Sequence, residues 1–271
     1  MPVSFRELLS RTSQSPHTVV VIPARFDSTR LPGKPLADIC GVPMIVHVYR
    51  RAAATPGVDA VIVATDDNRV VAAVEASGGV ACLTSSEHRT GTDRVAEVAA
   101  AIDCQIVINL QGDEPLIHPD MIQATLEPLL RDATLNMSTV CRAIDQQDDY
   151  LNPNVVKVVR SAQGMALYFS RSPIPHVRGP RPTLWKHFGI YGYRKAFLLQ
   201  FSRMPPTPLE QAESLEQLRA LEHGFGIYTA LTEHDSIGVD TPEDLDRARR
   251  LMSTRPTREA ANMGSGDRAH I

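Results

Sequence analysis

The sequence predicts an α/β protein with a doubly wound, mostly parallel, Rossmann-like sheet and a smaller antiparallel, strand-rich insertion. Two observations support this class. In the first half of the chain, short and almost continuously apolar runs alternate with segments of helical periodicity, an order typical of parallel strands covered by helices on both faces. Between residues 152 and 193, strand-like runs follow one another without a long helical pattern between them, as in antiparallel hairpins.

The predicted elements begin with a strand at 18–22, five β-branched residues that end at Pro23. Such residues favour strands because their side chains pack well on a pleated surface. The other predicted strands are at 59–64, 80–83, 105–110, 137–142, 155–160, 165–170, 187–194, 227–231 and 237–239. The predicted helices are at 42–55, from about 66 to 76, at 92–102, 118–130, 194–202 and 209–222, and from Thr241 onward.

Length and composition favour a single domain over 18–252, with the insertion at about 150–195. Residues 1–17 have no apolar stretch of signal-peptide length and are expected to be a disordered extension. Residues 253–271 are rich in Gly, Arg, Asp and Asn without periodicity and are expected to be a disordered tail. No run reaches the roughly 18 to 20 apolar residues that a membrane span needs, so we expect a soluble protein.

Charge and cysteine content restrict the partners and the compartment. The net charge is -3 and the pI about 6.3, so no overall basic field would attract nucleic acid or an anionic membrane. The four cysteines are scattered without CxxC spacing, which argues against disulfides and against a cysteine zinc site. This usage is typical of a reducing compartment, so a cytoplasmic location is expected.

A cationic loop follows the first predicted strand. It carries Arg25, Arg30 and Lys34 against one acid, Asp27. Two prolines bracket a glycine at 32–35, which disfavours a long helix and fixes the loop conformation. The segment lacks the glycine and hydroxyl positions of a Walker A motif and contains no GxGxxG. Arg and Lys in this arrangement suit a polyphosphate; the alternative is a solvated loop with surface charges.

Two acids, Asp113 and Asp240, are predicted just beyond the ends of strands. Ligands of open α/β sheets bind outside the carboxyl ends of the strands, where the cationic loop should also lie. Two carboxylates facing bound phosphates suit Mg²⁺, which takes one or two carboxylates together with phosphate oxygens. The alternatives are a turn residue before Pro115 and a helix-capping residue.

A second candidate region lies near the predicted helix at 209–222, which contains Glu210, Glu213, Glu216 and Gln217. Glu216 and Gln217 could offer acceptors to a polyhydroxylated ligand, while the alternative is a solvated helix face. In the insertion, Arg171 and His187 could hold an anionic sugar acid, or they could be a rim arginine and a structural histidine.

Seven motifs carry a resemblance to a known family, namely PARFDSTRLPGKPL with NLQGDEP, NPNVVKVV, ALYFSR, HFGIYGYR, SLEQLRALE and GVDTPEDL. Together they resemble the 3-deoxy-manno-octulosonate cytidylyltransferases, the CMP-Kdo synthetases, from about Thr18 to Met252. The first motif alone would indicate only the wider sugar nucleotidyltransferase superfamily. The later motifs are those of the Kdo branch.

The resemblance implies a Mg²⁺-dependent enzyme with a nucleotidyltransferase fold. Such an enzyme converts CTP and Kdo into CMP-Kdo and pyrophosphate for lipopolysaccharide synthesis, and is typically a homodimer. Carried over to this sequence, it implies triphosphate binding by Arg25, Arg30 and Lys34, cytosine recognition by Gln111, Thr90 and the backbone near Ala24 and Arg25, and metal binding by Asp113 and Asp240. It also implies Kdo binding by Arg171, His187, Tyr191, Glu216 and Gln217.

Two departures and two rival functions accompany this resemblance. Arg89 stands where many relatives are expected to have an uncharged polar residue, and the Pro-rich segment at 173–183 is not matched to a motif of the family. The first rival function is cytidylyl transfer to another acidic sugar such as sialic acid. The second is a non-catalytic nucleotide-binding module.

Overall fold

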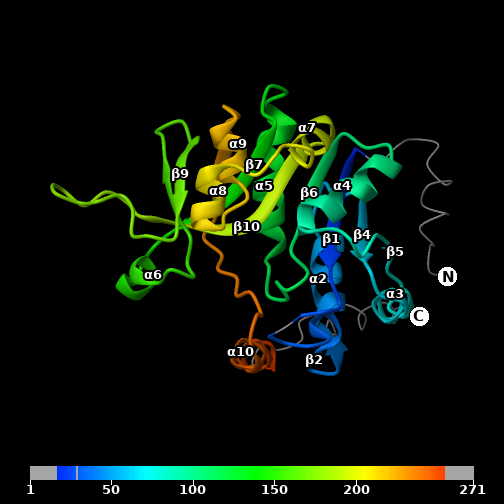
Figure 1. Ribbon diagram of the computed structural model, residues 1–271. Helices are drawn as coiled ribbons and strands as arrows, with labels where there is room; N and C mark the ends of the chain where they lie inside the picture. The colour runs from blue at the N-terminus through cyan, green and yellow to red at the C-terminus, as the bar shows by residue number, and fades with distance from the viewer. Residues whose placement is uncertain (1–16, 29, 254–271) are drawn as a thin grey trace, which may run out of the picture.

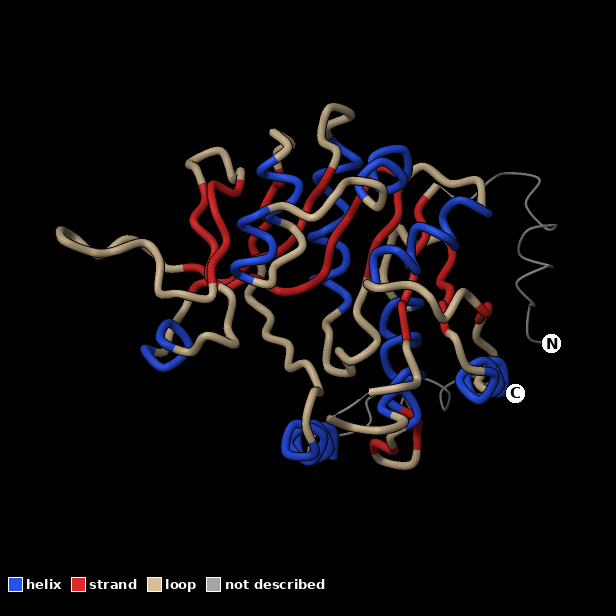
Figure 2. The backbone as a smooth tube through the Cα atoms, viewed as in Figure 1, coloured by secondary structure: helices blue, strands red, loops and turns tan. Residues whose placement is uncertain are grey.

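The computed structural model describes residues 17–28 and 30–253. Its main sheet contains nine strands, which Figures 1 and 2 show side by side. The strands are β1 (Thr18–Ala24), β4 (Ala60–Thr65), β5 (Ala81–Leu83), β6 (Ile106–Asn109), β7 (Met137–Ala143), β8 (Lys157–Arg160), β9 (Ala166–Ser170), β10 (Trp185–Arg194) and β11 (Ile227–Leu231). Their order is β11-β7-β10-β6-β1-β4-β5, and β8 pairs with both β10 and β9. The prediction of a mostly parallel α/β sheet is confirmed.

The helices that belong to the two large core clusters cover the two faces of this sheet, and the others pack elsewhere. The longer helices are α2 (Met44–Ala53), α3 (Asn68–Ala76), α4 (Gly91–Ala101), α5 (Pro119–Arg131) and α10 (Pro242–Ser253). The shorter ones are η1 (Lys34–Leu36), α6 (Gln147–Leu151), α7 (Lys195–Phe201), α8 (Pro208–Glu213) and α9 (Leu218–Glu222). A small second sheet pairs β2 (Asp38–Ile39) with β3 (Val42–Pro43).

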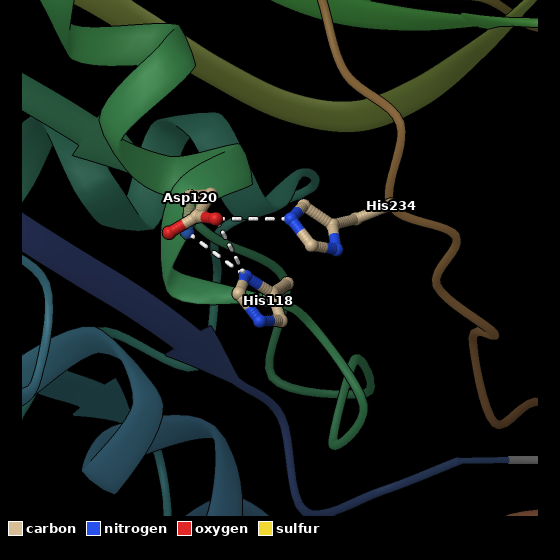
Figure 3. A group of neighbouring side chains, drawn as sticks. All are labelled: His118, Asp120 and His234. Atoms are coloured by element: carbon tan, nitrogen blue, oxygen red, sulfur yellow. Dashed lines mark hydrogen bonds and ion pairs between the residues drawn. The ribbon is translucent and has the colours of Figure 1, made fainter.

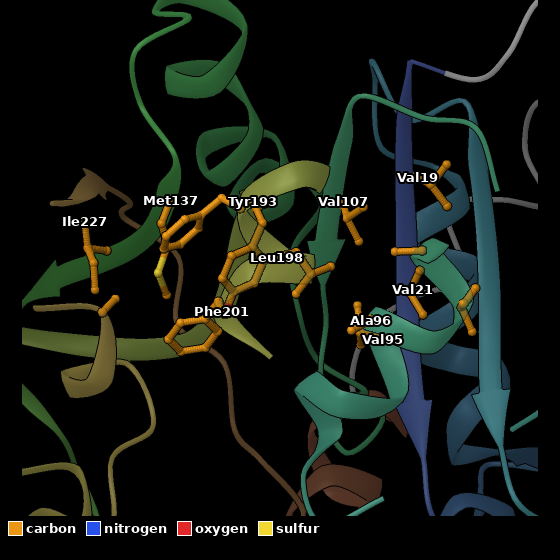
Figure 4. Packing of buried hydrophobic residues seen from close by; sticks show 14 of the residues in the cluster. Val19, Val21, Val95, Ala96, Val107, Met137, Tyr193, Leu198, Phe201 and Ile227 are labelled. Carbon is orange, nitrogen blue, oxygen red and sulfur yellow. The ribbon is translucent and has the colours of Figure 1, made fainter. Parts of the chain in front are cut away.

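The residues of β1 show why both faces of the main sheet are covered by helices. Side chains alternate between the two faces of a strand, and every residue of β1 is buried. Val19 and Val21 belong to the core cluster that includes α4 and α7, whereas Val20 and Ile22 belong to the cluster that includes α2, α3 and α5. Figure 4 shows the first cluster, with Val95 of α4 close to Val21. The apolar run thus specifies a central strand rather than an edge.

Strand directions place the loops of the predicted site at one edge. β1 is parallel to β4 and to β6, so the three carboxyl ends point the same way. β10 is the exception, because it runs antiparallel to both β6 and β7. The 150–195 segment is therefore not one separate antiparallel unit: β8 and β9 form the expected hairpin, but β10 inserts into the middle of the main sheet.

The single helix predicted at 209–222 is wrong. The chain forms α8 and α9 with a break at Ser214, whose φ of 52° is left-handed. Tertiary bonds take the place of the helical ones: the Arg171 guanidinium donates to the carbonyls of Glu213 and Ser214 at 2.8 and 3.4 Å. Helical periodicity cannot reveal such a break, because the side chain that satisfies the freed carbonyls belongs to Arg171, which is distant in the sequence.

The strand predicted at 237–239 is also wrong. The segment has no regular secondary structure, although the Val239 N–H donates to the Asp113 carbonyl at 2.8 Å. Its apolar residues are explained by packing, since Val239 is fully buried beside Leu245 and Ala248 of α10. The expected extension and tail lie almost entirely outside the described residues, in which no helix is long and apolar enough to cross a membrane.

The tight packing of β10 generates a stability prediction at Gly192. A Cβ at this position would lie 2.6 Å from Ser138 Oγ and 2.8 Å from Leu129 Cδ1. We expect Gly192→Ala to lower the free energy of unfolding by about 1–3 kcal/mol, because its neighbours must shift. Urea unfolding measures this change. Gly179→Ala, where no atom lies within 4 Å of a Cβ, is the matched control and should change stability by less than about 0.5 kcal/mol.

Candidate active site

A cavity of about 410 Å³ opens at the carboxyl ends of the parallel strands. The loops that follow β1 and β6 form two of its walls, and the segment before α10 supplies Asp240. The structure thus brings together the eight residues predicted to bind the triphosphate, the base and the metal. These residues are Ala24, Arg25, Arg30, Lys34, Thr90, Gln111, Asp113 and Asp240.

Local backbone geometry holds Lys34 at this cavity. Gly33 has a φ of 68°, a left-handed conformation that glycine adopts without steric cost. The chain then forms η1, a single 3₁₀ turn in which Pro35 is buried. The prediction of a loop without a long helix holds, but the loop contains this one fixed turn. Lys34 is therefore presented from an ordered backbone rather than from a flexible linker.

The central interaction of the cavity joins Lys34 to both predicted metal ligands. Its Nζ lies 2.6 Å from Asp113 Oδ2 and 3.1 Å from Asp240 Oδ1. Burial lowers the pKa of Lys34, but attraction to Asp113 and hydrogen bonds to both carboxylates outweigh this effect and raise the pKa above its ordinary value. Arg30 adds a second contact with Asp240 at 3.1 Å. Two acids far apart in the sequence thus converge on one cation.

The remaining residues of the cationic loop lie at the rim. Arg25 is exposed and donates to the His88 carbonyl. Arg30 has 65% of its side chain exposed. Arg89, the residue at which the sequence departs from the expected pattern, is exposed and also lines the cavity. These side chains can turn toward a polyanion without breaking a packed core.

Hydrogen bonds from neighbouring residues restrict the positions of Asp113 and Asp240. The segment that carries Asp240 is tied to the Asp113 loop by the Val239 amide and by Ser236, whose hydroxyl donates to Glu114. Burial, reinforced by the negative charge of Asp113, raises the pKa of Glu114 to about 7. Because Glu114 is then partly protonated near neutral pH, it adds less negative charge beside the two aspartates.

The part of the cavity that contains the predicted cytosine-binding residues is formed where two loops approach each other closely. A Cβ on Gly112 would lie 2.8 Å from the Pro23 carbonyl oxygen, so glycine is required where the loop after β6 meets the end of β1. The adjacent Gln111 donates from Nε2 to Asn109 Oδ1 at 3.2 Å. Thr90 caps α4, accepting the Asp93 N–H at 3.1 Å. The polar groups proposed for cytosine recognition are therefore held by neighbouring residues.

A chain of hydrogen bonds leads from Gln111 to one of the predicted sugar-binding residues. Asn109 Nδ2 donates to Thr92 Oγ1 at 3.3 Å, and the Thr92 hydroxyl donates to Glu216. Burial raises the pKa of Glu216, whereas Thr92 and Arg219 oppose the shift. Among the described residues, Glu216 Oε1 and Gln217 Nε2 are buried polar atoms without a hydrogen-bond partner. Such atoms are costly unless a ligand or water satisfies them.

The sugar-binding candidates do not line the main cavity, but three of them lie close together. The ring centroids of His187 and Tyr191 are 5.4 Å apart, and the Glu216 charge contributes to the raised pKa of Tyr191 after burial. Burial lowers the pKa of His187 to about 3, so its imidazole is neutral near pH 7. His187 Nε2 hydrogen bonds with Thr139 Oγ1 at 3.0 Å, so His187 can offer hydrogen bonds but not a positive charge.

Arg171 and two acids of the 209–222 segment, Glu210 and Glu213, form hydrogen bonds or ion pairs with other parts of the protein. The Arg171 guanidinium binds backbone carbonyls at the α8–α9 break and that of Pro153. Glu213 accepts from the Arg171 backbone N–H at 2.9 Å, and Glu210 pairs with the buried Arg219. The interpretation of these acids as a solvated face is therefore incorrect for Glu210 and Glu213.

Sequence reasoning missed three residues of this region. Thr92 and Asn109 connect the two parts of the site, and the buried Arg94 lines the cavity and pairs with Asp66 at 2.8 Å. A usable signal existed for Asn109, since it is a polar residue at the end of the apolar run of β6. Thr92 and Arg94 gave no comparable signal, because polar residues on a helix usually face solvent.

Comparison with known proteins first identifies the general class of this chain. A family model described as Cytidylyltransferase matches residues 19–233. A 3-deoxy-manno-octulosonate cytidylyltransferase from Geobacter metallireducens is 54% identical over 245 residues, which cover 86% of this chain and 96% of that protein. One from Syntrophobacter fumaroxidans is 53% identical and covers 84% and 94%, respectively. Within the class, this chain belongs to the 3-deoxy-manno-octulosonate cytidylyltransferase family, as the sequence motifs predicted.

Solved structures agree with this assignment. A structure of CMP:2-keto-3-deoxy-manno-octonic acid synthetase complexed with CTP has a TM-score of 0.84 and is 48% identical, covering 88% of this chain and 98% of that chain. A cytidylyltransferase from Leptospira borgpetersenii has a TM-score of 0.60 at 17% identity, which shows a shared fold alone.

The hydrogen-bond chain can be tested by Thr92→Val. The change keeps the side-chain shape but leaves the buried partners Asn109 and Glu216 with fewer bonds, so the free energy of unfolding should fall by about 1–3 kcal/mol. Urea unfolding gives the value. Thr134→Val is the matched control, because the Thr134 hydroxyl donates to Asp132 in an exposed turn. Equal losses in the two variants would contradict a special role for Thr92.

Proposed function

We propose that this chain transfers CMP from CTP to the anomeric hydroxyl of Kdo and releases pyrophosphate. The observation that carries the proposal is the placement of Lys34 between Asp113 and Asp240 in the cavity that Gln111 also lines. Relatives more than 50% identical bear the name of this activity, and a relative of similar fold was solved with CTP. Together these support both the nucleotide and the acceptor.

The proposed chemistry needs alignment and charge neutralisation rather than a covalent nucleophile. Arg25, Arg30 and Lys34 hold the triphosphate, while Gln111 and the backbone near Ala24 hold the cytosine. The anomeric oxygen then forms a bond to the α-phosphorus as the bond to the pyrophosphate oxygen breaks, and the hydroxyl proton passes to water. The protein lowers the barrier by orienting the reactants and by countering the charge that develops on the phosphate oxygens.

We include Mg²⁺ in this proposal, with Asp113 and Asp240 as its ligands. The fit is supported by the contacts of Lys34, because both carboxylates already accept one cation between them. Carboxylates and phosphate oxygens form the ligand set that Mg²⁺ favours. When bound, the ion neutralises phosphate charge and increases the electrophilicity of phosphorus. Lys34 is then free to turn from the carboxylates to the triphosphate.

For the sugar acid we propose Glu216, Gln217, His187, Tyr191 and Arg171. Gln217 Nε2 has no hydrogen-bond partner, and Glu216 Oε1 has only a 3.7 Å ion pair with Arg219. Both support this assignment, since a polyhydroxylated ligand supplies both donors and acceptors. A neutral His187 suits a hydroxyl better than a carboxylate. Arg171 would have to give up bonds to backbone carbonyls to bind the sugar carboxylate directly.

The cellular setting is proposed from the family and the composition. CMP-Kdo would serve lipopolysaccharide synthesis, and the scattered cysteines are typical of the cytoplasm. A homodimer is supported by exposed apolar side chains on the insertion, where Leu151 and Leu167 are 56% and 59% exposed. We propose no nucleic acid or membrane partner, in keeping with the net charge of -3.

One assay separates this function from its rivals. Pyrophosphate release is measured with Mg²⁺-CTP and either Kdo or a sialic acid. We expect release with Kdo alone; release with the sialic acid alone would move the chain to the other acceptor. Binding of CTP without pyrophosphate from any sugar acid would support a non-catalytic nucleotide-binding module.

Asp240→Asn tests the proposed metal ligand. We expect the rate constant kcat to fall by about 100-fold or more, because transition-state stabilisation by the ion is worth several kcal/mol. The matched control is Asp246→Asn, which removes an exposed carboxylate that pairs with Arg249 on α10. Near-normal turnover in Asp240→Asn, with a normal unfolding transition, would contradict the assignment.

Lys34→Ala tests the division between nucleotide and sugar. The KM for CTP should rise about ten- to hundredfold, since a charged hydrogen bond is worth about 1.5–3 kcal/mol. The KM for Kdo should change much less. Arg131→Ala, which removes an exposed cation outside the cavity, is the control. A larger effect on Kdo than on CTP would refute the proposed role.

A further inference from the structure

A second group of potential metal ligands lies outside the cavity. It contains His118 and Asp120 at the start of α5 and His234 in the segment between β11 and α10, as Figure 3 shows. One ligand atom from each of the three residues lies within 4.8 Å of the others. Among the described residues, this is the only group of three or more His, Cys, Asp or Glu side chains with such spacing.

The distances in this group suit a tetrahedral ion. Asp120 Oδ2 lies 3.4 Å from His118 Nδ1 and 3.0 Å from His234 Nε2. Bonds of about 2.0–2.1 Å from Zn²⁺ to nitrogen and oxygen place neighbouring ligand atoms about 3.3 Å apart in a tetrahedron. The carboxylate oxygen therefore already lies near ligand spacing from both imidazole nitrogens.

One contact within the group would also suit a bound cation. The backbone N–H of Asp120 donates to His118 Nδ1 at 3.2 Å, so this nitrogen carries a lone pair. The same nitrogen faces Asp120 Oδ2, which is another acceptor. Two acceptors that face each other repel, and a positive ion between them converts the repulsion into attraction.

The two imidazole rings are stacked, with centroids 3.6 Å apart and an interplanar angle of 6°. Ring lone pairs lie in the ring plane, so a shared ion requires one of the parallel rings to tilt. Both rings have room for this motion, because the side chains of His118 and His234 are 36% and 37% exposed. Coordination of a shared ion would therefore require the side chains to reorient from the observed arrangement.

We propose that His118, Asp120 and His234 form a site for a divalent transition metal, with Zn²⁺ as the representative ion and water as its fourth ligand. The ligand set differs from that of Asp113 and Asp240. Imidazole nitrogens favour zinc and its neighbours in the periodic table, whereas Mg²⁺ favours oxygen ligands. The site is therefore separate from the magnesium site of the proposed reaction, and it does not depend on that reaction.

The position of the site gives the ion a structural consequence. His118 and Asp120 follow the loop that carries Asp113, and His234 precedes Asp240 by six residues. In Figure 1 the segment from β11 to α10 is a long connection without helix or strand. A metal bound to His234 ties this connection to α5 and restricts the chain that delivers Asp240 to the cavity.

The test is a Zn²⁺ titration of the tag-free, full-length chain by calorimetry. We expect His234→Gln to weaken the single specific binding event at least about tenfold, and His223→Gln, which changes an exposed histidine elsewhere, to leave it unchanged. His118→Asn is the second variant, because asparagine keeps an N-cap acceptor for α5 but lacks the imidazole. Asp240→Asn separates the two sites and should leave zinc affinity unchanged.

Two further measurements give readouts that do not require catalysis. Bound Co²⁺ should show the visible absorption of a tetrahedral site in the wild-type chain and lose it in His234→Gln. Zn²⁺ should slow amide hydrogen exchange in residues 232–240 of the wild-type chain, and an excess of Mg²⁺ should not. Wild-type zinc affinity in both His234→Gln and His118→Asn, or loss of binding in Asp240→Asn alone, would overturn the proposal.

Discussion

The site depends on one ammonium group between two carboxylates. Lys34 comes from the turn after β1, Asp113 from the loop after β6, and Asp240 from the connection to α10, yet all three meet within 3.1 Å. Since the Lys34 side chain is only 15% exposed, its charge would carry a desolvation cost without the two acids, which are themselves partly exposed at 29% and 47%. The opposite charges stabilise one another, and these ion pairs hold the three segments together before any ligand binds.

A chain of buried and partly buried polar side chains leads from the cavity to the α8–α9 break. Gln111, Asn109, Thr92 and Glu216 form a continuous hydrogen-bonded chain between β6, α4 and the α8–α9 break. Such a chain fixes side-chain orientation because every member is held by its neighbours. It gives the region next to the cavity a defined set of donors and acceptors, and it leaves Glu216 Oε1 and Gln217 Nε2 without a hydrogen-bond partner.

Features that depend on neighbouring residues in the chain were predictable, while long-range features were not. The apolar run of β1 was predicted as a buried strand and agrees with the structure. The prolines around Gly33 predicted the absence of a long helix there, but not the single 3₁₀ turn that the structure contains. The break at Ser214 was not predictable in this way, since it depends on Arg171, which directly follows β9. The same holds for β10: its sequence indicates a strand, but not that it enters the main sheet between β6 and β7.

The sequence by itself determined the α/β class, the cationic loop, the two acids and, through its motifs, the family. Those signals reside in periodicity and in short runs of residues, which local chemistry constrains. Only the tertiary structure decided that Lys34 pairs with both acids, that His187 is neutral, and that His118 and Asp120 meet His234. The physical reason is common to all three: charge, burial and metal-binding geometry depend on which groups face each other across the fold, and spacing along the chain does not specify that.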